Sequence, residues 1–187
     1  MSKYDGCRAF CYLEPGRCRL ISRNGNQMHR FAGLSDQIAA SLDVSDAILD
    51  GEIIATDETG RPQFYDLLRD TRAPAYVAFD LLWLNGADLR ALPLSEHRRQ
   101  LQSILPKGSR SILEPLSVTG RGHRLFELMR AHDLEGIVAN PTCAVWGWCW
   151  RFLLGRREGD QSVSGRAEPI GACSDDLGYF LSLRRWF

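Results

Sequence analysis

Short apolar runs separated by turn dipeptides dominate the first half of the chain. Pro15-Gly16 divides two such runs, which predicts a hairpin with strands over 7–13 and 18–22. A longer run over 75–86, ended by Asn85-Gly86, is the most β-like segment of the sequence. Because short turns join neighbouring antiparallel strands, this spacing favours hairpins and a mostly antiparallel sheet.

The remaining segments add helices between these strands. Helical spacing of apolar residues predicts helices over 34–42, 94–105 and 123–133. Further strands are expected over 47–57, interrupted at Asp50-Gly51 and closed by a turn at Thr59-Gly60, and over 134–139. The helices follow no regular β-α-β alternation. We therefore predict an α+β fold of mostly antiparallel sheets with flanking helices.

Composition and charge limit the classes of partner that the chain is expected to bind. Its 187 residues are 44% hydrophobic, and 23 basic residues balance 23 acidic ones. No overall field therefore draws the protein to nucleic acid or membrane, and such a partner must bind a local patch. No apolar run is long enough to cross a bilayer, and the N-terminus lacks the pattern of a signal peptide. These features predict a cytoplasmic protein without a membrane partner.

The cysteines and histidines suggest no metal or nucleophile site. The six cysteines form no C-x-x-C pair, and we expect them to be reduced and partly buried. The four histidines are expected in loops or on polar helix faces, and their order suggests no catalytic triad. They are His29, His97, His123 and His132.

One lysine stands at the start of the first strand, in "KYDGCR". Lys3 and Lys107 are the only lysines among the 23 basic residues. Unlike arginine, a lysine amine can lose its proton near neutral pH and act as a nucleophile. Taken alone, Lys3 is equally well explained as a solvated terminal charge, and Asp5-Gly6 as a turn.

Lys3 belongs to an ordered set of motifs. They are "KYDGCR" (3–8), "SRNG" (22–25), "ILDGEI" (48–53), "FDLLWLNG" (79–86), "DLRALPLSEHRRQL" (88–101) and "LEGIVA" (134–139). In this order the set resembles the adenylation (nucleotidyltransferase) domain of ATP-dependent DNA ligases, most closely the bacterial end-joining ligase D group. The resemblance covers roughly residues 3–140 and implies an ATP-grasp-like nucleotidyltransferase fold.

The resemblance also implies a reaction. In that family the motif lysine attacks the α-phosphate of ATP, releases pyrophosphate and carries AMP as a phosphoramidate. AMP then passes to a DNA 5′-phosphate, and the neighbouring 3′-hydroxyl displaces it to seal the nick. Lys3 matches this catalytic lysine. ATP, Mg²⁺ and nicked or broken double-stranded DNA are the implied cofactors and partners.

Five more residues match family positions. Arg8 and Arg23 match arginines on the ribose and phosphate side of the ATP pocket. Glu52 matches a carboxylate that contacts the ribose hydroxyls, and Phe79 matches the aromatic residue that stacks on adenine. Glu135 matches the carboxylate associated with the divalent metal. From the residues alone, Phe79 would be a core side chain, whereas Glu52 and Glu135 are carboxylates within apolar strands and need partners.

The sequence departs from the family pattern at three places. Met1 stands where an acidic residue usually precedes the lysine, and Asn140 stands where a lysine follows "EGIVA". No lysine follows Lys107, so the family's final Trp-x-Lys-x-Lys motif is missing. We therefore expect an adenylation domain over 1–140, incomplete at its N-terminal edge. Residues 141–187 are expected to be a divergent Trp-rich tail without an OB-fold domain, which we interpret as an out-of-frame or replaced end.

The sequence thus predicts the nucleotidyltransferase core of an ATP-dependent DNA ligase, forming lysine-AMP for sealing nicks in DNA repair and recombination. The missing lysines predict weak or no retention of AMP. Two other interpretations stay open, namely a non-catalytic nucleotide- or DNA-binding remnant and an unstable truncated product. Trp146, Trp148 and Trp150 alternate, which favours a packed edge strand over a base-stacking platform.

Overall fold

The computed structural model describes residues 6–57 and 63–115 with their side chains. It also describes the backbone of residues 118–119, 136–141, 151–154 and 179–182. Several sequence predictions lie outside these residues: Lys3, Glu135, Thr59-Gly60, the helix expected over 123–133 and the alternating tryptophans.

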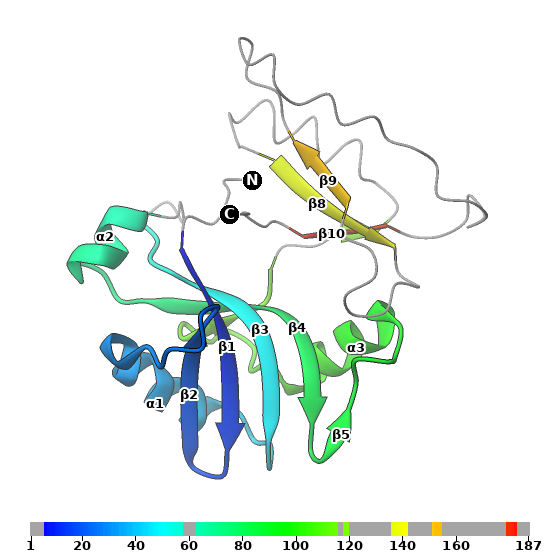
Figure 1. Cartoon of the computed structure of the whole chain (residues 1–187), viewed down its shortest axis with the longest axis horizontal. Coiled ribbons are helices and arrows are strands. Elements are labelled where there is room, and N and C mark those ends of the chain that lie inside the picture. The colour runs from blue at the N-terminus through cyan, green and yellow to red at the C-terminus, as the bar shows by residue number, and fades with distance from the viewer. Residues whose placement is uncertain are drawn as a thin grey trace.

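A mostly antiparallel sheet forms the main body of the described structure (Figure 1). Its strands are β1 (Cys7–Glu14), β2 (Arg17–Ser22), β3 (Ala47–Ile54), β4 (Ala75–Leu84), β5 (Ala87–Asp88) and β6 (Ile112–Leu113). The order is β2-β1-β3-β4-β5, and β6 pairs with β4. The β4–β6 pair is parallel, whereas the pairs along the main path are antiparallel.

The helices pack one apolar face of this sheet into a core. They are the short η1 (His29–Phe31), α1 (Ala32–Ser41), α2 (Phe64–Arg69) and α3 (Leu94–Ile104). Ile38 of α1 and Leu101 of α3 are fully buried in the same cluster as Cys11 and Leu49 of the sheet. None of the helices described is long and apolar enough to span a bilayer.

A second antiparallel sheet follows in the chain. It consists of β7 (Val118–Thr119), β8 (Gly136–Pro141), β9 (Arg151–Leu154) and β10 (Tyr179–Ser182), in the order β7-β10-β8-β9. The strand predicted over 134–139 therefore exists, although it begins and ends about two residues later. Asn140 lies within it, opposite Phe180.

The predicted hairpin and α+β architecture are confirmed. β1 and β2 pair from Ala9–Ser22 to Glu14–Arg17, so Pro15-Gly16 forms the turn between them. The short β6 and helix α2 were not predicted, because two to six residues carry too little periodic pattern.

The interruption expected at Asp50-Gly51 is present only as a shift of the β3–β4 register between these residues, because β3 itself runs unbroken through both. Gly51 is required by close packing. A Cβ built there would lie 2.3 Å from the Val77 carbonyl oxygen and 2.5 Å from Tyr76 Cζ. The irregularity lies in the partner strand, where register shifts against Ile48–Gly51 mark bulges in β4.

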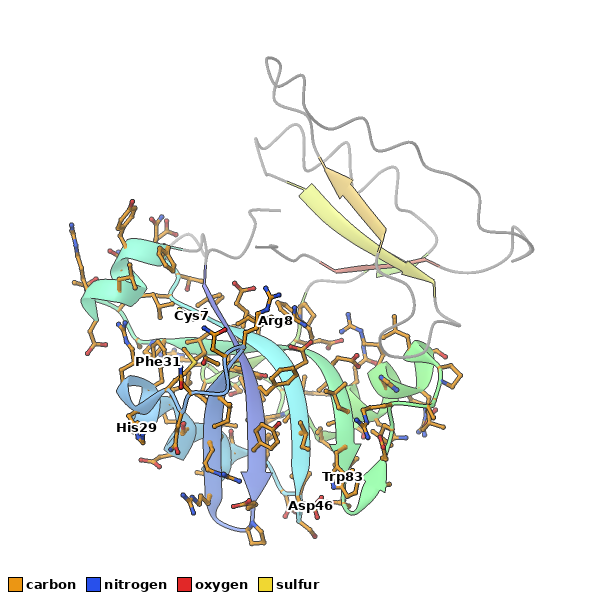
Figure 2. All side chains as sticks on the ribbon, viewed as in Figure 1. Cys7, Arg8, His29, Phe31, Asp46 and Trp83 are labelled. Atoms are coloured by element: carbon orange, nitrogen blue, oxygen red, sulfur yellow. The ribbon has the colours of Figure 1, made fainter. Side chains whose placement is uncertain are left out.

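The turn after β4 is fixed by an acidic side chain at the start of the neighbouring strand β3. Asn85 and Gly86 both have positive φ, 47° and 83°, as a tight hairpin turn requires. One Asp46 carboxylate oxygen accepts hydrogen bonds from the Gly86 amide and from the Trp83 indole (Figure 2). This contact anchors the β4–β5 hairpin to the start of β3.

Candidate active site

Alternation along the central strands brings two of the predicted site residues together. Arg8 of β1 lies directly opposite Glu52 of β3 in the antiparallel ladder, so their side chains leave the same face of the sheet. The neighbouring pair, Ala9 and Gly51, faces the helix-covered core. Arg8 and Glu52 therefore lie on the face opposite α1 and α3.

Arg8 is held by a bidentate ion pair with Asp50. Its Nε and Nη2 donate to the two carboxylate oxygens of Asp50 at 3.1 and 2.7 Å. Asp50 is fully buried, whereas the Arg8 side chain is 33% exposed. Burial lowers the pKa of Arg8, but the hydrogen bond and charge of Asp50, together with the charge of Glu52, raise it overall. Arg8 is thus a fixed guanidinium with an exposed edge (Figure 2).

The glycine of "KYDGCR" lies against Glu52. A Cβ added to Gly6 would lie 2.2 Å from the Ile53 carbonyl oxygen and 2.9 Å from Glu52 Cγ. No larger residue fits there without displacing β3. The segment that leads back from Gly6 toward Lys3 therefore begins in contact with the Glu52 side chain.

Phe79 is buried on the same side of the sheet. It is 2% exposed and packs with Ile54 and Val77 in a small apolar cluster. Val77 pairs with Glu52, so this apolar cluster lies next to Glu52. The register skips Phe79 between Ala78 and Asp80, so Phe79 is the extra residue of a bulge.

Arg23 lies at the same end of the sheet as Arg8. The last β1–β2 pair joins Ala9 to Ser22, so the next positions along these strands are Arg8 and Arg23. Arg23 is exposed and follows β2 in a turn closed by the Gly25 amide, which donates to the Ser22 carbonyl at 2.9 Å. The structure thus gathers four of the six predicted site residues at one end of the sheet, while Lys3 and Glu135 lie outside the described residues.

Among the described residues, no three histidine, cysteine or acidic side chains form a metal-binding cluster. Magnesium commonly takes one or two carboxylates from a protein and completes its shell with phosphates and water. Glu52 is a carboxylate at this face. Glu52 matches the ribose-contacting carboxylate, whereas Glu135, which matches the metal-associated one, lies outside the described residues.

Comparison with known proteins decides the family. A sequence model of the ATP dependent DNA ligase domain matches residues 2–149. The chain belongs to the ATP-dependent DNA ligase family. As a ligase domain it is 32% identical over 158 residues to the multifunctional non-homologous end joining protein LigD of Mycolicibacterium smegmatis. That match covers 83% of this chain and 20% of the relative.

Other relatives agree with this assignment. A DNA ligase of Methanothrix thermoacetophila is 32% identical over 158 residues, which cover 75% of this chain and 28% of that protein. The solved ligase domain of Mycobacterium tuberculosis LigD superposes with a TM-score of 0.62 at 26% identity. A mycobacterial DNA ligase D complexed with ATP and MES gives the same values, and both cover 84% of this chain. This chain spans half the length of those solved chains and about a fifth of the LigD relatives.

Two buried acidic residues of this ligase domain were not predicted from the sequence. Asp50 carries the ion pair to Arg8, and Asp80 accepts from His97 on α3, whose Nδ1 lies 2.9 Å away. The expectation that His97 sits on a polar helix face is wrong, because it is fully buried. Each aspartate interrupts an apolar strand, which was the signal that singled out Glu52.

A separate cavity lies on another part of the ligase domain. It has a volume of about 200 Å³ and lies between β2 and α1, lined by residues that include Arg17, Cys18, His29 and Asp36. Figure 2 shows His29 beside α1, away from Arg8. The four predicted site residues that the structure describes do not line this cavity.

Proposed function

We propose that this chain is the nucleotidyltransferase core of an ATP-dependent DNA ligase and forms a lysine-AMP intermediate at Lys3. ATP would bind the sheet face that carries Arg8 and Glu52. The alternative, a non-catalytic nucleotide- or DNA-binding remnant, differs from this proposal in the absence of the covalent step.

The contact between Gly6 and Glu52 carries the proposal. Lys3 lies three positions before Gly6, and an extended chain over three positions spans about 10 Å at most. Lys3 can therefore reach the neighbourhood of Glu52 and of the fixed guanidinium of Arg8. This supports a nucleophile, a carboxylate and a phosphate-binding group in one site.

In the proposed reaction, the deprotonated Lys3 amine attacks the α-phosphorus of ATP. A P–N bond forms, the bond to the bridging oxygen breaks, pyrophosphate leaves and the amine gives up its second proton. A free lysine amine has a pKa of about 10.4, so nearby positive charge is needed to favour its neutral form. Arg8 and Arg23 would supply that charge and bind phosphate oxygens. Magnesium bound with Glu135 would neutralise phosphate charge.

Glu52 and Phe79 would hold the nucleoside. A carboxylate can accept hydrogen bonds from both ribose hydroxyls. Adenine would stack on the Phe79 ring, which packs on Ile54 and Val77 and is thereby fixed in orientation. Because Phe79 is 2% exposed, we expect its side chain to become more exposed when ATP binds, so that the ring contacts the base.

The later steps would use DNA as substrate. AMP would pass from Lys3 to the 5′-phosphate of a nick, and the 3′-hydroxyl would then displace AMP, in repair or recombination. We propose that residues 1–140 provide the adenylation function and that 141–187 are a divergent tail, whose strands β9 and β10 pair with β8. A cytoplasmic location remains a prediction.

Covalent labelling tests the proposal. The full chain is incubated with magnesium and ATP labelled at the α-phosphate, denatured and scored for retained label. Lys3→Arg keeps the positive charge but removes the nucleophile, while Lys107→Arg makes the same change at the other lysine. We expect low labelling in the wild type and in Lys107→Arg, because no lysine follows Lys107, and none in Lys3→Arg.

A separate binding measurement distinguishes the alternative. If ATP binds the wild type but no Lys3-dependent label is retained, the non-catalytic interpretation is correct and the proposed reaction is wrong. Label that survives in Lys3→Arg would place the nucleophile elsewhere and would also overturn the proposal.

A further inference from the structure

Two cysteine thiols meet on neighbouring strands of the first sheet. Cys11 of β1 and Cys18 of β2 lie diagonally across the hairpin, and their Sγ atoms are 3.3 Å apart. Both are free thiols. Cys7 lies four residues before Cys11, about 13 Å along the strand, which is too far for a bond between them.

The two thiols have different environments. The hydrogen bond from Cys11 lowers the pKa of Cys18 despite partial burial, and a hydrogen bond from Ser35 adds to this effect. The same hydrogen bond and full burial raise the pKa of Cys11 well above its ordinary value. Cys18 is thus the thiol that ionises first, with the Cys11 S–H as its donor.

Solvent access also favours oxidation of Cys18 before Cys11. Cys18 is half-buried and lines the cavity of about 200 Å³ between β2 and α1. Cys11 is fully buried. A small oxidant entering the cavity would therefore reach Cys18 first, with Cys11 directly behind it.

We propose that Cys11 and Cys18 form a peroxide-sensitive dithiol, in which Cys18 is oxidised first and Cys11 closes a disulfide across the β1–β2 hairpin. The Cys18 thiolate attacks hydrogen peroxide, which breaks the O–O bond and leaves a sulfenic acid and, after protonation, water. The Cys11 sulfur then attacks the Cys18 sulfur, the S–OH bond breaks, and the Cys11 proton leaves with the hydroxide as a second water.

Closing the bond requires only a small movement. A disulfide has an S–S length of about 2.05 Å, so the two sulfurs must approach by roughly 1.2 Å. Rotation of the half-buried Cys18 side chain provides part of this movement, and the edge position of β2 allows the strand to shift. The proposal is independent of the ligase chemistry.

Peptide mapping tests the proposal, because trypsin cuts between the two cysteines at Arg17. The reduced full chain is exposed to hydrogen peroxide, blocked with iodoacetamide, digested without reductant and analysed by mass spectrometry. We expect the peptide 9–17 joined to the dipeptide 18–19, two hydrogen atoms lighter than their sum. Peptide 4–8, which contains Cys7, should be recovered in alkylated form.

Three variants complete the test. Cys7→Ser should keep the cross-link and serves as the control for a half-buried thiol on the same strand. Cys18→Ser should abolish it and leave Cys11 unoxidised. Cys11→Ser should abolish it and accumulate a sulfenic acid on Cys18 that a dimedone reagent traps.

The peptide map of the oxidised wild type tests the proposal even if a variant at buried Cys11 fails to fold. Oxidation of Cys18 to a sulfinic or sulfonic acid without any cross-link between peptides 9–17 and 18–19 would overturn the proposal. So would a cross-link that joins Cys11 or Cys18 to another cysteine, or a cross-link whose yield falls in Cys7→Ser.

Discussion

Gly51→Ala should destabilise the fold severely, because the added methyl group has no space. It would meet the Val77 carbonyl oxygen at 2.3 Å and the Tyr76 ring at 2.5 Å. The Tyr76 hydroxyl is buried and donates to the carbonyl oxygens of Ala9 and Leu49, at 2.9 and 3.1 Å. The methyl group therefore disturbs three neighbouring strands.

The loss of unfolding free energy in Gly51→Ala follows from these contacts. Displacing Tyr76 disrupts two hydrogen bonds, each contributing about 1 kcal/mol. Forcing β4 away from β3 adds an overpacking cost of about 1–3 kcal/mol. The total is about 3–5 kcal/mol, a large share of the roughly 5–15 kcal/mol by which a domain is stable.

Urea unfolding followed by circular dichroism measures the change in unfolding free energy. Gly33→Ala is the matched control, since Gly33 lies in α1, has no atom within 4 Å of an added Cβ and has no positive φ. That control should stabilise the chain by up to about 1 kcal/mol. If Gly51→Ala lies within about 0.5 kcal/mol of the wild type, the packing of Tyr76 against Gly51 is wrong.

Two other predictions concern buried charges. Arg8→Met should lower the unfolding free energy by about 2 kcal/mol, a value discounted for the partial exposure of Arg8. Adding Asp50→Asn should recover part of this loss. If the two effects are additive in a double-mutant cycle, the ion pair is contradicted. For His97, burial lowers the pKa, but the hydrogen bond and charge of Asp80, with the Leu89 carbonyl, raise it overall. The resulting stabilisation is complete below about pH 6.5 and is lost as pH rises through the folded-state pKa. The unfolding free energy of wild type minus that of His97→Gln should therefore fall as the pH rises above about 6.5, and a rise would refute the assignment.

Local patterns predicted much of the fold, because each carries its own physical cause. Pro15-Gly16 and Asn85-Gly86 satisfy turn geometry that few other residues adopt, so the hairpins at both places were predictable. Asp50-Gly51 was only partly predictable, because the strand is unbroken there and Gly51 is needed for packing against Tyr76. A sequence does not display which side chain will occupy the space above a glycine.

The candidate site was partly predictable for a similar reason. Glu52 stood out as a carboxylate among apolar neighbours, but Asp50 met the same criterion and was interpreted only as part of an interruption in the strand. Pairing of Asp50 with Arg8 depends on the β1–β3 register, which forms between residues 42 positions apart. His97 appeared polar by its helical neighbours, yet its partner Asp80 comes from a different element.

The location of the bound nucleotide tests the central claim most directly. Photo-crosslinking with an azido analogue of ATP, followed by peptide sequencing, would identify the residues nearest the base. We expect labels within 50–54 of β3 or 77–79 of β4, beside Glu52 and Phe79. Labels confined to the cavity between β2 and α1, around His29, would contradict that claim.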